Sequence, residues 1–128
     1  MTPRAGAPAA TTLVTGASPA ARELAIAAAL PDPQQLSTAI ILEGLAPGSS
    51  PLDTLPDSVQ LARIAPGCLC CTGNLVLRVT LNRMLRARQR PERIFIGIAR
   101  SEHLDQLRSW LQSEPYDQLL TLTPDLEA

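Results

Sequence analysis

The sequence contains no lysine, so all eleven of its basic residues are arginines. Its only aromatic residues are Phe95, Trp110 and Tyr116, which excludes a surface for stacking the bases of single-stranded nucleic acid. Eleven basic residues against twelve acidic ones leave a formal charge of −1, which gives no overall attraction to nucleic acid or to anionic membranes. We therefore expect an aliphatic core and no nucleic-acid or membrane partner.

Long apolar runs are also missing, and none is long enough to span a bilayer. The N-terminus lacks the charged region and apolar core of a signal peptide, so we expect a cytoplasmic protein. Residues 1–10 are rich in alanine and proline without periodicity, which predicts a mobile arm. A chain of 128 residues suits one further domain, predicted over residues 11–128.

Short β-prone runs alternate with helical patterns along the chain. The apolar run Thr38–Leu42 does not alternate with polar residues, as expected for a strand covered on both faces of a parallel sheet. Strands are expected at 11–15, 38–42, 58–64, 93–99 and 119–123, and helices at 20–30, 77–85 and 104–111. This order predicts a three-layer α/β domain with a mostly parallel sheet.

The cysteines are few and tightly clustered: Cys68, Cys70 and Cys71. An odd number of thiols in a reducing compartment indicates metal ligands or redox groups rather than a disulfide framework. Zinc and copper(I) both favour thiolate sulfur, and structural zinc usually takes four ligands. The remaining ligand could be His103, Glu43, water or a cysteine of a second molecule. The alternative is that these thiols serve as small buried apolar groups.

The segment Gly67–Thr72 matches the pattern G-C-x-C-C-[ST] in full. In this it resembles the CobW-type P-loop GTPases, the CobW/HypB/UreG family of metallochaperone-like proteins. Residues 12–16, 40–43 and 93–98 are similar to the core strands of that family. The resemblance implies a P-loop NTPase-like fold, here truncated, and zinc binding at the cysteine turn. It also implies that nucleotide binding is coupled to metal delivery.

A working phosphate loop reads G-x-x-x-x-G-K-[ST], because its backbone amides wrap the phosphates, its lysine neutralises them and its hydroxyl holds magnesium. The matching window here is Gly16–Glu23. Ala21 replaces the second glycine, Arg22 the lysine and Glu23 the hydroxyl residue, while Pro19 removes an amide donor. Only Gly16 and Arg22 persist as a vestigial cofactor-binding pair, able at most to bind phosphate weakly through the arginine and the helix N-terminus.

The third core strand of the family usually continues into Glu-x-[ST]-Gly. This chain has Gly97–Arg100 instead, and it contains no N-K-x-D motif for reading guanine. We therefore expect neither bound GTP with magnesium nor useful GTPase activity. The arginines between residues 78 and 100 are interpreted as a solvated helix face and loop rather than a phosphate-binding patch.

The leading hypothesis is a zinc-binding accessory or metallochaperone-like protein with a degenerate nucleotide site. Its metal ligands would be Cys68, Cys70 and Cys71, with His103 as a candidate fourth, and its partners the metal ion and a homologous or client protein. Two alternatives stay open: a GTP-binding protein with residual activity, and a non-catalytic module that pairs with a full-length homologue. Glu43 is either part of a site at the strand end or a solvent-exposed carboxylate.

Overall fold

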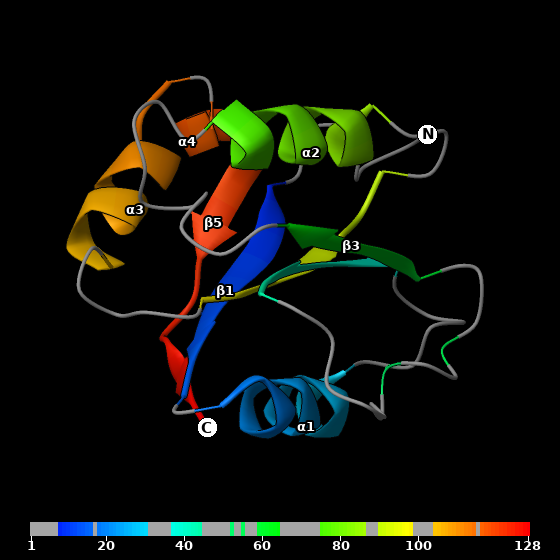
Figure 1. Ribbon diagram of the computed structural model, residues 1–128. Coiled ribbons are helices and arrows are strands. Elements are labelled where there is room, and N and C mark those ends of the chain that lie inside the picture. The colour runs from blue at the N-terminus through cyan, green and yellow to red at the C-terminus, as the bar shows by residue number, and fades with distance from the viewer. Residues whose placement is uncertain are drawn as a thin grey trace.

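A computed structural model of the chain describes the following residues: 8–16, 18–30, 37–44, 52, 55, 59–64, 75–86, 90–98, 104–114 and 116–128. They form a parallel sheet with helices on both faces (Figure 1). Helix α1 covers one face of the sheet, and α2, α3 and α4 lie over the other. The predicted three-layer α/β architecture is confirmed.

The sheet has six strands in the order β3-β2-β4-β1-β5, and β6 pairs with β1 beyond the end of β5. Every strand pair is parallel. The strands are β1 (Ala9–Thr15), β2 (Thr38–Glu43), β3 (Gln60–Ile64), β4 (Arg93–Gly97), β5 (Leu120–Leu122) and β6 (Leu126–Glu127). The helices are α1 (Pro19–Ala29), α2 (Leu75–Leu85), α3 (Leu104–Leu111) and α4 (Tyr116–Leu119).

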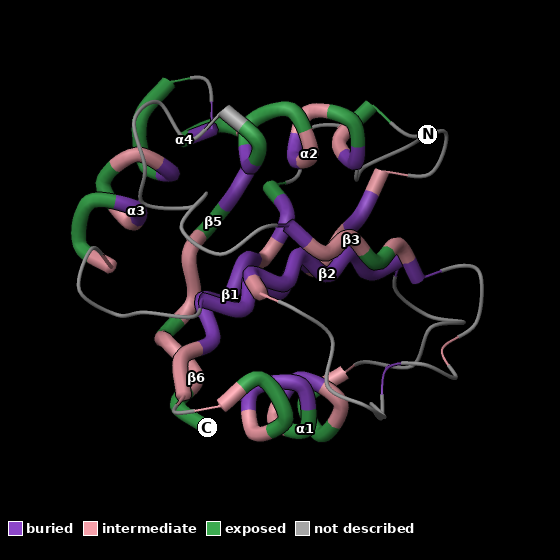
Figure 2. Tube along the Cα trace, in the orientation of Figure 1, coloured by how far each residue is buried: buried purple, intermediate pink, exposed green. Residues whose placement is uncertain are grey.

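Two aliphatic cores lie on opposite faces of the sheet, and Figure 2 shows the buried residues concentrated along the central strands. Successive residues of a strand point to opposite faces, so Ile40 joins the core under α1 while Ile41 joins the core under α2 and α3. All six residues of β2 are buried. The unbroken apolar run that predicted a doubly covered strand is thereby explained.

The boundaries differ from expectation at both ends of the chain. Strand β1 begins at Ala9, so the last two residues of the expected 1–10 arm belong to the sheet, while residues 1–7 lie outside the described part. Leu119 closes α4 instead of opening the last strand. Strand β6 was not predicted, because a two-residue strand after a proline leaves no periodic signal.

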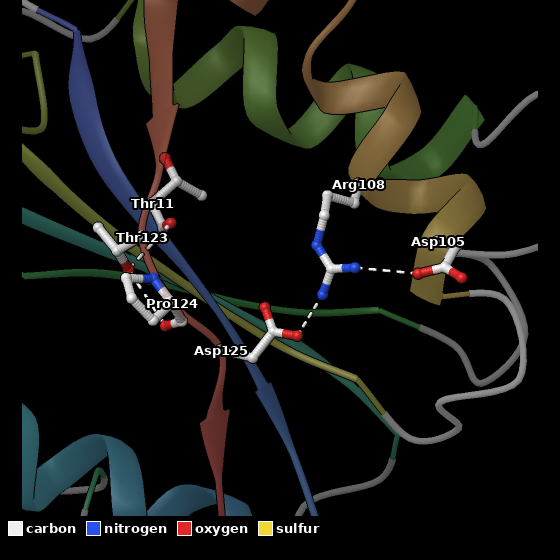
Figure 3. A network of polar contacts seen from close by, with 6 residues as sticks. All are labelled: Thr11, Asp105, Arg108, Thr123, Pro124 and Asp125. Carbon is white, nitrogen blue, oxygen red and sulfur yellow. Dashed lines mark hydrogen bonds and ion pairs between the residues drawn. The ribbon is translucent and has the colours of Figure 1, made fainter.

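An arginine of α3 anchors the segment between β5 and β6 (Figure 3). Arg108 donates to Asp105 within the helix at 2.9 Å and also pairs with Asp125. Thr123 donates to the carbonyl oxygen of Thr11 and thus ties the same segment to β1. These contacts lead β6 alongside the end of β1, where the phosphate-loop residues begin. Among the helices described, none is long and apolar enough to cross a membrane.

Candidate functional site

The carboxyl ends of the parallel strands meet at one edge of the sheet, which is where α/β proteins bind their ligands. Gly16 follows β1 there, and Glu43 ends β2. In the β2–β3 register Glu43 lies opposite Ile64, so Arg63 is one position short of the same edge. The loop window Gly16–Glu23 therefore opens onto the same edge as Glu43 and Arg63.

The first turn of α1 retains few donors for an anion. Ser18 is the N-cap residue, and its hydroxyl oxygen accepts a hydrogen bond from the amide of Ala21 at 3.1 Å. Pro19, the first helical residue, has no amide hydrogen. Of the first three helical residues, Pro19 to Ala21, only Ala20 therefore keeps an amide hydrogen that a ligand could use, whereas a phosphate loop offers several amides to its ligand.

Arg22 is buried and directed at the start of its own loop. Its Nη1 donates to the carbonyl oxygen of Gly16 at 2.8 Å. Burial lowers the pKa of the guanidinium, and the negative charges of Glu43 and Glu23 act in the opposite direction. The two predicted cofactor-binding residues, Gly16 and Arg22, are thus brought together in contact with each other.

Glu23, at the position of the magnesium-binding hydroxyl, pairs with an arginine of β3. Both carboxylate oxygens accept from Arg63, Oε2 from Nη1 at 2.9 Å and Oε1 from Nη2 at 3.1 Å. The side chain of Glu23 is only 3% exposed and that of Arg63 is 24% exposed. A bidentate arginine–carboxylate pair is among the stronger polar contacts a protein can make, so Glu23 is committed to holding α1 against β3.

The space beside Gly16 is filled as well. The amide of Ala128, just after β6, donates to the carbonyl oxygen of Thr15 at 2.7 Å. A Cβ added to Gly16 would lie 2.7 Å from the Cβ of Ala128 and 3.1 Å from the Cγ of Arg22. Glycine is required here because neighbouring parts of the protein pack closely against it, a different reason from wrapping a phosphate.

The predicted metal ligands Cys68, Cys70, Cys71 and His103 lie outside the described residues. In the chain, the cysteine segment joins the end of β3 at Ile64 to the start of α2 at Leu75. Within the ranges that the structure describes, no three or more histidine, cysteine, aspartate or glutamate side chains gather as a metal site.

Arginines of the middle of the chain differ in their surroundings. Arg83 and Arg86 are exposed on or just after α2, as expected for a solvated helix face. Arg93 is not part of that face: its guanidinium carbon lies 4.3 Å from the centre of the Phe95 ring. Its Nη1 also donates to the carbonyl oxygen of Ala10 at 2.9 Å, so this residue holds β4 to β1.

The decisive comparison is with protein families. The model of the CobW/HypB/UreG nucleotide-binding domain matches residues 11–121, which is most of the chain. The chain belongs to this family. No curated protein and no solved structure matches it. The resemblance drawn from the cysteine turn is confirmed, and the fold is that of a family of P-loop GTPase-related metallochaperones.

Sequence reasoning missed one residue of this charged cluster and left another open. It placed Arg63 in a strand without a role, and it gave Glu43 as either a site residue or an exposed carboxylate. Glu43 is buried, and its charge acts on the guanidinium of Arg22. The sequence did contain a signal for Arg63. Glu23 stands at the hydroxyl position of the phosphate loop, and a carboxylate buried there needs a basic partner, for which an arginine near the end of a neighbouring strand is the natural candidate.

Proposed function

We propose that this CobW-family domain is a cytoplasmic zinc-binding accessory protein that holds metal through Cys68, Cys70 and Cys71 and does not use GTP. One observation carries the nucleotide half of the proposal. Arg22 and Glu23 stand at the lysine and hydroxyl positions of a phosphate loop. Arg22 donates to the Gly16 carbonyl oxygen, and Glu23 accepts two hydrogen bonds from Arg63.

The charges at the sheet edge argue against a triphosphate. Among the residues that the structure describes at this edge, Arg22 and Arg63 bring two positive charges and Glu23 and Glu43 bring two negative ones, so these four residues together are formally neutral. Phosphoryl-transfer sites instead concentrate positive charge and metal ions around the phosphates. A phosphate arriving here would have to displace the Gly16 carbonyl from Arg22 and lie beside two carboxylates. We infer that magnesium–GTP binds poorly.

The metal half rests on the donor chemistry of the cysteine turn. Three thiolates suit zinc or copper(I), and a fourth ligand from His103 or from a partner chain would complete a tetrahedral zinc site. A reducing compartment keeps such thiols available. Zinc held in this way needs no nucleotide to stay bound. This agrees with a phosphate loop in which Arg22 and Glu23 contact other groups of the protein.

Metal analysis of protein purified without chelators or metal-affinity columns tests the zinc assignment. We expect about one zinc ion per chain, bound tightly enough to survive gel filtration. The double variant C70S/C71S should lose that ion, whereas Leu24→Ser, a change at an exposed residue of α1, should retain it. Equal zinc content in C70S/C71S and the unchanged protein would remove the assignment.

Titration with GTP and magnesium tests the first alternative, a GTP-binding protein with residual activity. The neutral cluster predicts no saturable binding below about 1 mM nucleotide, a free energy weaker than about −4 kcal/mol. A micromolar dissociation constant would revive the alternative and contradict our proposal.

A pairing module is the second alternative, and one observation favours it. Strand β3 is the outermost strand of the order, and Leu61 in it is exposed. The outer side of β3, which is distinct from the carboxyl edge of the sheet, could therefore accept a strand of another chain. Light scattering of the isolated protein, alone and mixed with a full-length homologue, decides the point. A monomer that stays monomeric in the mixture disfavours pairing and leaves the zinc proposal standing.

A further inference from the structure

Helix α2 carries exposed apolar residues together with unbalanced positive charge. Val76 and Val79 are 42% and 48% exposed, and they are two of the four large apolar residues exposed in the described part of the chain. The helix and Arg86 directly after it contain arginines but no acidic residue. Exposed valines beside arginines with no acidic residue in the same helix are a combination that a partner of opposite charge could bind.

The outward residues of α2 form one continuous stripe. Val76, Val79, Arg83 and Arg86 follow one another at intervals of three or four residues, which places them on one face of a helix. The stripe is about 15 Å long at the rise of an α-helix. A surface hollow of about 510 Å³ lies along it, lined by Val79, Asn82, Arg83 and Arg86. We call these residues, with Val76, the α2 stripe.

Apart from Asn82, which accepts a hydrogen bond from the Tyr116 hydroxyl, the stripe takes no part in packing the helix onto the sheet. The opposite face of α2 buries Leu77, Leu81 and Met84 in the core. Arg83 and Arg86 form no ion pair with the residues that the structure describes. Arg78 differs, since its guanidinium lies 5.4 Å from the centre of the Trp110 ring and helps hold α2 to α3.

We propose that the α2 stripe docks an acidic amphipathic helix of a partner protein. The two arginines complement carboxylates, and the two valines give an apolar strip of the kind that such a helix covers. A stripe about 15 Å long on a helix surface suits a helix better than a compact small molecule, which binds in a concave pocket that buries most of its surface. A nucleic acid fits poorly, because no aromatic side chain lies in the stripe. The inference goes beyond the proposed function and does not depend on zinc.

Fluorescence anisotropy with a labelled synthetic peptide tests the docking surface. The probe is a capped helix of about 16 residues with leucines on one face and glutamates beside them, compared with the same peptide carrying lysines. The full chain should bind the glutamate peptide with a micromolar dissociation constant that weakens between about 50 and 300 mM salt. It should bind the lysine peptide about tenfold or more weakly.

Two double variants locate the binding. R83E/R86E should weaken the glutamate peptide about tenfold or more and should gain affinity for the lysine peptide. V76A/V79A should weaken the glutamate peptide several-fold, and because alanine favours helix it leaves α2 intact. Leu24→Ala, at an exposed apolar residue on the other side of the sheet, is the matched control and should bind as the unchanged protein does.

Circular dichroism establishes that each variant is folded before its binding is compared. The proposal is overturned if the glutamate peptide does not bind below about 1 mM, or if R83E/R86E binds it unchanged. Tighter binding of a single-stranded oligonucleotide than of the glutamate peptide also overturns it, in favour of a phosphate-binding surface. A reversed peptide preference in R83E/R86E establishes the stripe as the docking site.

Discussion

The middle of the sheet and its carboxyl edge bury different kinds of residue. In the middle, Leu13, Ile41 and Phe95 are fully buried and apolar, as in any doubly covered parallel sheet. At the edge, Arg22, Glu23 and Glu43 are nearly as deeply buried and carry charge. Apolar packing is the main source of stability in the middle. The edge contains the bidentate pair between Glu23 and Arg63 and the hydrogen bond from Arg22 to the Gly16 carbonyl oxygen, so its stability depends on polar contacts.

The largest effect is expected from the middle of the sheet. Leu13→Ala removes a fully buried side chain of β1 and leaves a cavity in the core that α2 and α3 cover. The free energy of unfolding should fall by about 4 kcal/mol, measured by urea denaturation. A fall of less than about 1 kcal/mol would mean that the core relaxes around the change. The middle of the sheet would then be no more sensitive to substitution than its carboxyl edge.

At the edge, Glu23→Ala removes the carboxylate that accepts both hydrogen bonds from Arg63. Breaking a buried pair from one side usually costs about 3–5 kcal/mol, and we expect the lower value because Arg63 keeps 24% of its side chain exposed. Urea denaturation measures it. Glu114→Ala, at an exposed position, is the control and should change the unfolding free energy by less than about 0.5 kcal/mol.

Replacing both partners sharpens the comparison. E23L/R63L should recover most of the stability lost in Glu23→Ala, because a well-packed apolar pair often equals a buried ion pair to within about 1 kcal/mol. If the double variant is as unstable as the single one, the charges themselves hold the edge together. That result would mean that the edge and the middle of the sheet are stabilised by different forces.

Alkaline pH tests the packing of α2 and α4 over the sheet. Tyr116 is the single tyrosine of the chain, and its hydroxyl donates to Oδ1 of Asn82 at 2.9 Å. Burial raises the pKa of Tyr116, against smaller opposing effects of Arg78 and of the Asn82 hydrogen bond. Because the folded pKa lies above the unfolded value of about 10, the associated stability is intact below pH 10 and is lost as pH rises through the folded pKa.

Ultraviolet absorbance of tyrosinate follows this ionisation directly. We expect its midpoint above that of the protein unfolded in urea, with thermal stability falling over the same pH range. Tyr116→Phe should remove this pH dependence. A midpoint equal to that of the unfolded protein would show that Tyr116 is not buried in solution.

The smallest effect is expected at Arg108, where neither ion pair contains a fully buried side chain. Arg108→Ala removes the contacts with Asp105 and Asp125. The side chains of Asp105, Arg108 and Asp125 are 98%, 34% and 25% exposed, so the loss should be about 1 kcal/mol and should shrink in high salt. A loss comparable with that of Glu23→Ala would show that the β5–β6 segment depends on this arginine, and would weaken the distinction between this segment and the carboxyl edge.

The sequence predicted the central elements well because their signals are local. The run Thr38–Leu42 and the helical spacing of Leu77, Leu81 and Met84 are readable from residue type and period alone, and β2 and α2 confirm them. The cysteine turn pointed to the family, which the match over residues 11–121 confirms. Zinc binding at that turn stays a prediction.

The candidate site could be predicted only in part, because its contacts join distant residues. Comparing Gly16–Glu23 with the phosphate-loop pattern shows that Arg22 and Glu23 stand at its lysine and hydroxyl positions, but it does not show which residues they contact. Glu23 and Arg63 are forty positions apart in the sequence, and only the pairing of β2 with β3 brings the arginine to the same edge as α1. Short elements such as α4 and β6 were missed because they take their shape from tertiary contacts.

The bidentate contact between Glu23 and Arg63 makes single substitutions toward the phosphate-loop pattern costly. Threonine at position 23 would supply the hydroxyl of that pattern, but Arg63 would lose the carboxylate that accepts two of its hydrogen bonds. Lysine at position 22 would likewise lose the guanidinium contact with the Gly16 carbonyl oxygen. A designer who wants to install nucleotide binding in this domain would therefore have to change positions 22, 23 and 63 together rather than one at a time.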